Sequence, residues 1–190
     1  MKKVILALGI LVAGTATLSL VSCDKLKKEA LKNLNYDLTF QTAETQFTVS
    51  PQSNTGTYFD AASASETLDL DKFIKDNTAN QLGIDNIKSA KIKSCTLTIL
   101  NPDAGNNFQN FSMAQVKLNA TGQPQLELKI ENNPDTYAES LTLPVDASKD
   151  ILPYLKAGNW NYMIGGTLRT ATTKDLTIKV RFAVDINVGS

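Results

Sequence analysis

Residues 176–188 read LTIKVRFAVDINV, and this stretch decides the fold class of the chain. Every second residue from Leu176 to Val188 is apolar, whereas the residues between them are polar or charged, apart from Ala183. A period of two places all the apolar side chains on one face of an extended strand. The stretch therefore predicts a long β-strand in an antiparallel sheet that has one buried face and one solvated face.

Shorter stretches with the same alternation occur throughout the preceding sequence. We expect strands at 36–40, 47–49, 57–60, 87–100, 116–120, 126–130, 141–145 and 160–168. Clusters of Gly, Pro, Asn and Asp separate them and are typical of turns. The small, polar residues 61–66 are expected to form a loop. The apolar phase changes between Phe40 and Phe47, which predicts a bulge or tight turn near Glu44.

Two segments are predicted to be short helices, 71–82 and 146–158. Gly83 follows the first segment and Gly158 is the last residue of the second. Both stand where a helix C-terminus favours left-handed backbone. Aspartates that can cap the first turns are Asp69 or Asp71, and Asp150.

These elements together predict a mainly β protein. The expected architecture is an antiparallel β-sandwich of immunoglobulin-like type, with about eight or nine strands and one or two short helices. The Cys and Trp spacing of true immunoglobulin domains is missing, so the prediction concerns architecture alone. A β-barrel with an internal cavity is the alternative.

The N-terminus has the three-part layout of a secretory signal. Met1-Lys2-Lys3 is basic, 4–13 is apolar apart from one glycine, and 14–19 is smaller and more polar. A transmembrane anchor over 4–21 is an alternative, at the lower length limit for crossing a bilayer and diluted by glycines and hydroxyl residues.

The signal ends in Leu20-Val21-Ser22-Cys23, which resembles the lipobox of bacterial lipoproteins. The resemblance implies a diacylglyceryl (and, on the new amino group, commonly a palmitate) modification of Cys23, with signal cleavage between Ser22 and Cys23. An ordinary signal peptide with an accidental cysteine is the other alternative. The implied organisation is a signal peptide at 1–22, a lipidated cysteine and tether at 23–35, and a single domain at 36–190. Two or three acyl chains would attach the protein to a membrane durably without embedding it.

The tether repeats an apolar residue every four positions among several lysines. It is interpreted either as a short helix on lipid headgroups or as a solvated spacer. Further along, the segment LPVDASKDILPYLKAGNWNYMIGG (143–166) is similar to small uncharacterised lipoproteins of Gram-negative bacteria. That resemblance implies a cell-envelope location and no activity. Asp24 after the cysteine resembles the inner-membrane retention signal of some enteric bacteria, a rule that does not hold across Gram-negative groups. The outer membrane is therefore the expected location, with the periplasmic or surface side left open.

Composition limits the possible chemistry. After removal of 1–22, 17 basic and 19 acidic residues remain, and a near-neutral body without a basic stripe argues against nucleic-acid binding. The chain has no histidine, which excludes histidine-based triads and disfavours a zinc or copper site. Cys95 is the single cysteine apart from Cys23, so no internal disulfide is expected once Cys23 is lipidated. We expect no metal and no cofactor.

Some polar residues could still support catalysis or metal binding. The pairs Asp69–Asp71 and Asp146–Asp150 could supply the two carboxylates of a glycosidase, but both lie at predicted helix starts, which favours a capping role. Cys95 shares a face with Leu97 and is interpreted as a core residue rather than a nucleophile. Oxygen-bearing residues around Gly105 resemble a calcium loop superficially, and a turn is the preferred interpretation: Asn101, Asp103, Asn106 and Asn107.

Aromatic residues fall into two groups. Trp160 and Tyr162 continue the alternation of a strand and are predicted to be core, with an outward glycan platform as the alternative. The others lie in loop-like contexts and are predicted to form an exposed binding patch: Tyr58, Phe59, Phe108 and Phe111.

The functional hypothesis is a non-enzymatic, lipid-anchored cell-envelope protein. It would act as a binding or assembly module for another envelope component, either a protein or a glycan. One alternative is a carrier of lipid or another apolar ligand, which requires an apolar cavity. The other is a glycan-binding or glycosidase-like protein.

Overall fold

The computed structural model describes residues 34–190. The expectations for the signal peptide, for Ser22 and Cys23 and for most of the tether lie outside the described residues. No helix within 34–190 is long and apolar enough to span a membrane.

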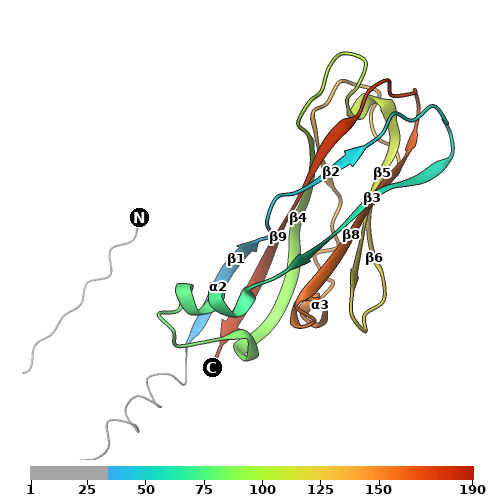
Figure 1. The fold of residues 1–190 in the computed structure, drawn as a ribbon. Helices are drawn as coiled ribbons and strands as arrows, with labels where there is room; N and C mark the ends of the chain where they lie inside the picture. The colour runs from blue at the N-terminus through green and yellow to red at the C-terminus, as the bar shows by residue number, and fades with distance from the viewer. Residues whose placement is uncertain (1–33) are drawn as a thin grey trace, which may run out of the picture.

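Nine strands form two antiparallel sheets packed face to face (Figure 1). The five-stranded sheet, called sheet A, has the order β1-β9-β4-β7, and β2 also pairs with β9. The four-stranded sheet, sheet B, has the order β3-β8-β5-β6. The strands of sheet A are β1 (Asn35–Gln41), β2 (Thr45–Val49), β4 (Ile87–Ile99), β7 (Ser140–Leu143) and β9 (Leu176–Gly189). Those of sheet B are β3 (Tyr58–Thr67), β5 (Phe111–Ala120), β6 (Leu126–Ile130) and β8 (Asn159–Leu168).

The sandwich prediction is therefore confirmed. The two sheets remain separate within 34–190, so the alternative of a closed barrel is wrong. Two short α-helices accompany the strands within 34–190: α2 (Leu70–Asn77) and α3 (Leu152–Lys156). The predicted helix 146–158 is helical only over 152–156, because 146–149 form a turn in which Lys149 N donates to Asp146 O at 3.2 Å.

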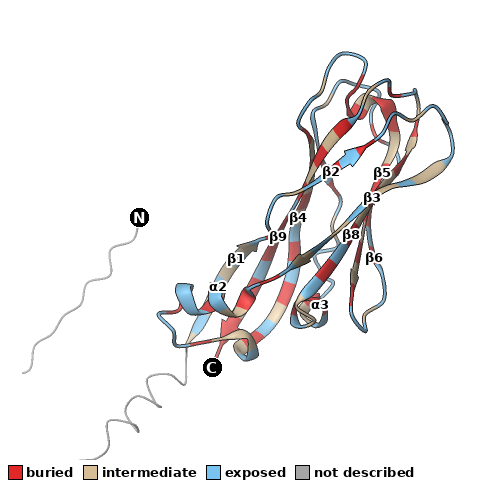
Figure 2. Ribbon diagram, viewed as in Figure 1, coloured by how far each residue is buried: buried red, intermediate tan, exposed pale blue. Residues whose placement is uncertain are grey.

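The strand β9 lies at the centre of sheet A. It pairs with β1 and β2 on one side and with β4 on the other. The apolar residues that alternate along it are all buried, and Figure 2 shows red segments alternating with lighter ones along the strand. A strand with partners on both sides and one apolar face is the arrangement that its alternating sequence predicts.

One extra residue separates β1 from β2 along the edge of sheet A. Gln41 lies opposite Ala183 and Thr45 lies opposite Val180, so four steps on the edge face three steps on β9. The buried Thr42 still lies opposite Phe182, where its N–H donates to Phe182 O and its Oγ1 accepts from Phe182 N, both at 3.1 Å. The extra residue therefore falls at 43–44. The insertion resets the alternation, which confirms the predicted irregularity near Glu44.

Residues 61–66 are a strand and not the predicted loop. They belong to β3, which pairs with β8 along its length. The small side chains of Ala62 and Ala64 lie opposite the bulky Ile164 and Tyr162. Small residues beside bulky neighbours fit a sheet whose core the partner strand fills, so tertiary pairing overrides the weak strand propensity.

The first helix is shorter than predicted, and Gly83 does not end it. Helix α2 stops at Asn77 because the buried Thr78 hydroxyl donates to Ile74 O at 2.8 Å and accepts from Leu82 N at 3.2 Å. The left-handed positions fall at Ala79 and Asn80, with φ of 50° and 59°. In contrast, Gly158 has a φ of 75° and ends α3 as expected.

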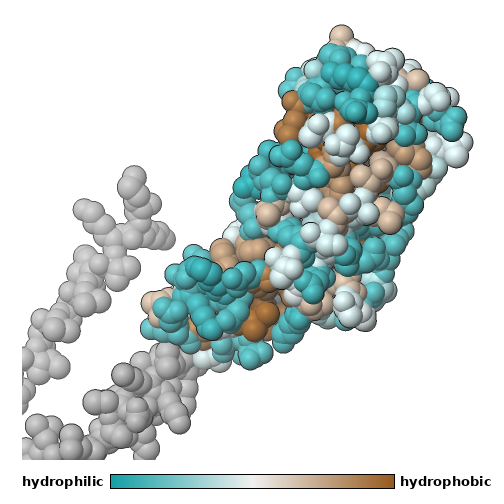
Figure 3. Space-filling view, viewed as in Figure 1, coloured by the Kyte–Doolittle hydropathy of each residue, from teal (hydrophilic) through white to brown (hydrophobic). Residues whose placement is uncertain are grey.

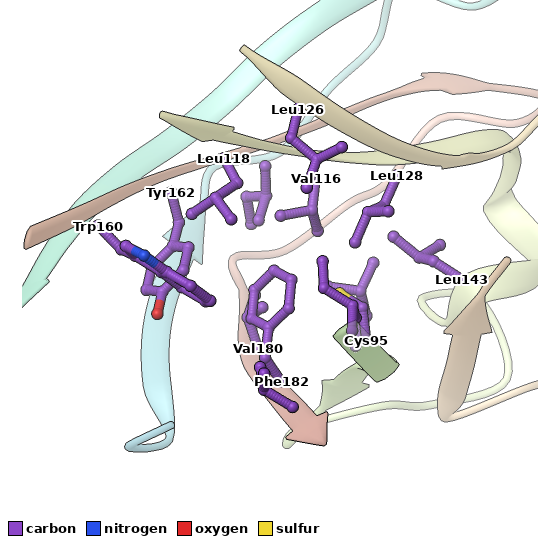
Figure 4. Packing of buried hydrophobic residues seen from close by; sticks show 14 of the residues in the cluster. Cys95, Val116, Leu118, Leu126, Leu128, Leu143, Trp160, Tyr162, Val180 and Phe182 are labelled. Atoms are coloured by element: carbon purple, nitrogen blue, oxygen red, sulfur yellow. The ribbon is translucent and has the colours of Figure 1, made fainter. Parts of the chain in front are cut away.

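The core lies between the sheets and is tightly packed (Figure 4). Tyr162 stacks on Phe182 with ring centroids 5.3 Å apart, and Trp160 meets Phe182 edge-on at 5.7 Å. The prediction that Trp160, Tyr162 and Cys95 are core residues is therefore confirmed. Two small cavities have volumes of about 10 and 20 Å³, which is room for one water molecule each. The first lies between the sheets, and the second is also lined by the exposed Asp146 and Lys149.

Candidate functional site

The two ends of the sandwich differ in kind. At one end Ser190 N donates to Leu34 O at 3.2 Å, so the first and last described residues lie together there. At the other end three loops meet (Figure 1). We call this the distal loop end and define it as residues 100–110, 131–139 and 169–175. Loops on a rigid scaffold are where binding residues concentrate, and the distal loop end is the candidate functional site.

A buried asparagine ties two of these loops together. Asn110 is 5% exposed. Its Nδ2 donates to Gly105 O, Thr170 Oγ1 and Ala171 O at 3.0 to 3.1 Å, and its Oδ1 accepts from Asn107 N at 2.9 Å. The backbone carbonyl of the same residue accepts from Arg169 N at 2.7 Å. Loops that lack regular pairing are thereby fixed by side-chain amides.

Three more buried asparagines repeat this role. Asn106 Nδ2 donates to Thr173 Oγ1 at 3.1 Å, and its Oδ1 accepts from Thr173 N at 2.8 Å. Asn107 Oδ1 accepts from Gln109 N at 2.8 Å. Asn133 Nδ2 donates to the carbonyls of Phe108 and Phe111 at 2.7 and 2.9 Å. The network holds the loops in one arrangement before any partner arrives, which lowers the entropic cost of binding.

A hollow of about 310 Å³ opens between these loops. It is lined by Ala104, Gly105, Gln109, Asn110, Asp135, Thr170 and Ala171. Asp135 has a side chain that is 63% exposed; it lies 3.5 Å from Arg169 Nη1, and its Oδ1 accepts from Gln109 Nε2 at 3.0 Å. The guanidinium is held in turn, since Nη1 and Nη2 donate to Gln109 O and Asn133 O at 2.7 and 2.6 Å.

Two large hydrophobic side chains are exposed among the described residues, and both lie at this end. Leu100 is 45% exposed and Tyr137 is 50% exposed. They lie on neighbouring segments, because Ile99 N donates to Glu139 O at 2.8 Å. The hydroxyl of Tyr137 donates to Glu139 Oε1 at 2.7 Å, and this bond to a carboxylate raises the pKa of the phenol. Exposed apolar side chains on fixed loops are features of binding surfaces.

A surface ion pair closes the first loop. Lys174 Nζ lies 2.6 Å from Asp103 Oδ2, and Asp103 Oδ1 accepts from Gly105 N and Asn106 Nδ2. The lysine, followed by these two donors, lowers the pKa of the carboxyl to about 2.

The residues considered for calcium are therefore used within the turn. Asn101 Oδ1 accepts from Thr177 N, and the side-chain oxygens of Asp103, Asn106 and Asn107 also accept hydrogen bonds from the protein. This supports the interpretation of 101–106 as a turn.

The predicted aromatic patch does not form. Phe108 and Phe111 are 1% and 4% exposed, and their rings pack 5.8 Å apart in the core. The turn context hid their burial, because the short helical turn 108–110 carries Phe108 inward before β5 begins. Phe59 is partly buried against the core.

Tyr58 lies elsewhere, on the solvent face of sheet B. Its hydroxyl donates to Asp60 Oδ1 at 2.5 Å, and Lys117 Nζ lies 2.8 Å from the same oxygen and 4.7 Å from the ring centroid. The ring crosses Gly165, where a Cβ would lie 2.5 Å from Tyr58 Oη. Partial burial and the bond to Asp60 raise the pKa of the phenol, and Lys117 lowers that of Asp60. Tyr58 is thus held in place by its contacts with Asp60 and Lys117.

The aspartates considered as catalytic pairs all have structural partners. Asp69 accepts from Lys72 N at the start of α2, and Asp71 pairs with Lys75 at 2.5 Å. Asp146 accepts from Ser148 N. Asp150 accepts from Ala90 N and Leu152 N, both at 3.0 Å, and so joins α3 to β4. Asp69 is the N-cap of α2 as predicted, and Asp71 lies in its first turn. Asp146 instead lies in a turn before α3, whose N-cap is Ile151 without a side-chain hydrogen bond, so the capping role predicted for the second pair is wrong.

Sequence reasoning missed the residues that distinguish the distal loop end. Tyr137 is an aromatic residue in an otherwise polar loop, and Leu100 continues an apolar strand into a turn. Either exception could have identified the position. The hollow beside Asp135 combines three loops that are far apart in the chain, and no local pattern signals it.

Comparison with known proteins adds little. No protein-family model and no curated protein sequence matches this chain. Among solved structures, one titled Desmodium yellow mottle tymovirus covers 96% of this chain and 94% of its own, at 14% identity and a TM-score of 0.31. One of infectious bursal disease virus, Gx strain, covers 82% of this chain and 32% of its own, at 11% identity and a TM-score of 0.35. One of black queen cell virus covers 100% and 84%, at 11% identity and a TM-score of 0.18. Similarities this low support no functional conclusion.

Proposed function

We propose that this protein is a non-enzymatic, lipid-anchored cell-envelope module that binds another envelope component through its distal loop end. The observation that carries the proposal is that the two ends of the sandwich differ. The described chain begins at one end, and the fixed loops with their hollow and exposed side chains lie at the other. A lipid on Cys23 would therefore hold the first end near a membrane and present the second.

The core supports a binding module over the alternative of an apolar carrier. The two most apolar cavities, of about 10 and 20 Å³, are far smaller than the several hundred Å³ of a typical ligand pocket. The surface hollows are open and partly polar, as in the case of the one beside Asp135.

The anchor is tested by changing Cys23 to Ala in the full chain. Labelling cells with a palmitate analogue should mark the wild-type protein in the membrane fraction, and the variant should be unlabelled. Equal labelling of both proteins would reject lipidation at Cys23. Separated inner and outer membranes then show which of the two carries the protein.

The binding surface is tested by crosslinking in cells. A photoreactive phenylalanine replaces Tyr137 in one protein and Thr142, on the solvent face of sheet A, in a control protein. We expect a discrete crosslinked species from position 137 and none from position 142. Similar products from both positions, or none from 137, would contradict the assignment of the distal loop end.

A further inference from the structure

The hollow at the distal loop end offers a specific set of unused polar atoms. Asp135 uses Oδ1 for Gln109, and within 34–190 no protein donor reaches its Oδ2. Gln109 Oε1 likewise accepts no hydrogen bond from the described residues. Thr170 Oγ1 accepts from Asn110 and keeps its own proton to donate. Two acceptors and one hydroxyl donor thus border one space.

Three of the residues that line the hollow are small. Ala104, Gly105 and Ala171 contribute at most a methyl group each. The amide of Asn110, which also lines the hollow, is saturated by three loop acceptors, and these bonds fix the surrounding loops and leave the amide no donor to share. A volume of about 310 Å³ with small residues in its lining accommodates a flat or ring-shaped group of modest size.

The electrostatics of the hollow select against ions. Arg169 lies 3.5 Å from the Asp135 carboxylate and is itself held by two backbone carbonyls, so the charge of Asp135 is balanced within the protein. A cationic side chain would compete with that guanidinium. An anionic group would be repelled by the carboxylate of Asp135. A neutral ligand that carries several hydroxyl groups satisfies the remaining acceptors and the donor without unbalanced charge.

We infer that this hollow binds a neutral, hydroxyl-rich glycan, with Asp135 and Gln109 accepting from its hydroxyl groups and Thr170 donating to one. Tyr137 stands two residues from Asp135 on the same loop, with half of its surface exposed. An exposed aromatic ring of this kind packs against the apolar face of a sugar. The inference rests on the proposed function, because it names the chemistry of the component that the distal loop end would bind.

The test uses the full chain in micelles of a detergent without a sugar headgroup. Maltopentaose, cellopentaose and mannopentaose serve as neutral probes, with tetragalacturonate and pentalysine as charged counterparts. Calorimetric titration should detect binding of at least one neutral probe and of neither charged one. Asp135→Ala and Gln109→Ala should each weaken that binding at least tenfold.

Two further variants separate binding from folding. Ala171→Phe fills the exposed rim of the hollow and should abolish binding while leaving the unfolding transition in place. The matched control is Asp60→Ala, which removes another surface aspartate paired with a cation, on sheet B, and should leave the affinity unchanged.

Specific outcomes overturn the inference. These are no binding of any neutral probe at 10 mM, tighter binding of a charged probe, or equal loss in the Asp60 and Asp135 variants. Failure here with a discrete crosslink at position 137 would refute the glycan and leave the binding module standing. Failure of both experiments would refute the proposed function itself.

Discussion

At the scale of single residues, the molecule uses buried amides where it lacks strand pairing. Asn106, Asn107, Asn110 and Asn133 are at most 5% exposed, and each connects segments that are distant in the chain or turns a loop back on itself. An asparagine side chain offers both a donor and an acceptor in the geometry of a peptide group. It can therefore satisfy loop backbone that would otherwise be buried without partners.

Asn110→Ala should destabilise the protein by about 2 kcal/mol or more, because it leaves several loop groups unpaired at roughly 1 kcal/mol each. Urea unfolding measures the change. Asn54→Ala, in an exposed loop, is the matched control and should change stability by less than about 0.5 kcal/mol. A similar small effect for Asn110→Ala would show that the network does not hold the loops.

The ion pair of Asp103 makes a prediction about acid. The pKa of this carboxyl is lowered from 3.8 to about 2 in the folded protein, so its contribution to stability is present above pH 4 and is lost as the pH falls toward 2. Thermal unfolding followed from pH 5 to pH 2 should show a steeper loss for the wild type than for Asp103→Asn. Parallel curves for the two proteins would contradict the coupling to Lys174.

At the scale of elements, one side chain of the edge strand β3 connects the two sheets. Strand β3 is an edge of sheet B and carries no lysine, arginine or proline. From it, Glu66 crosses to sheet A, where Oε1 accepts from Ala43 N at 2.8 Å beside the inserted residue of the β1–β2 edge. Its Oε2 accepts from Tyr162 OH at 2.6 Å. A bulge between Asp60 and Ala62 also interrupts this edge. Both features protect an edge strand from pairing with another chain.

Glu66→Ala should therefore lower stability and promote self-association together. The loss leaves Ala43 N and Tyr162 OH without this acceptor, at about 2–3 kcal/mol in total. Chemical unfolding and analytical ultracentrifugation measure the two effects. Glu127→Ala removes an exposed glutamate on the edge strand β6 and should change neither. Destabilisation without self-association would show that Glu66 stabilises the contact between the two sheets but does not prevent β3 from pairing with another chain.

At the scale of the whole molecule, the two sheets enclose Cys95 at their common centre. The thiol is 0% exposed, and burial raises its pKa strongly. Its reaction with a disulfide reagent requires the sheets to separate. Across a set of variants, we expect the labelling rate to be lower where the free energy of unfolding, measured with urea, is higher. Fast labelling of the native protein, independent of stability, would contradict the tight packing of this core.

The sequence predicts the sandwich because the signal is carried by long alternating strands. The period of two along β9, β8 and β4 is strong, and the core positions of Trp160 and Tyr162 on β8 and of Cys95 on β4 follow from it. The strand at 61–66 is missed because its small residues have meaning only beside the bulky side chains of β8. The end of α2 is missed because the Thr78 hydroxyl, a side-chain contact, stops the helix before the glycine.

The candidate site is harder to predict than the fold. Its asparagines look like ordinary turn residues, and the contacts of Asn106 and Asn110 depend on loops 60 or more residues apart meeting at one end. Of the aromatic residues chosen from loop context, Phe108 and Phe111 are buried, whereas the exposed Tyr137 is an aromatic residue in an otherwise polar loop, a local signal that marks one position but not the surface around it. Three-dimensional proximity decides such a surface, and local pattern does not encode it.

The position of β9 at the end of the described chain also determines when this domain can fold during synthesis. The strand that joins β1, β2 and β4 is the last of the nine to leave the ribosome. At roughly 5–20 residues per second, β1 waits on the order of ten seconds or more for its partner. During that interval sheet A lacks its central strand, so β1, β2 and β4 have no common partner and the sandwich cannot be completed until the last strand has been made.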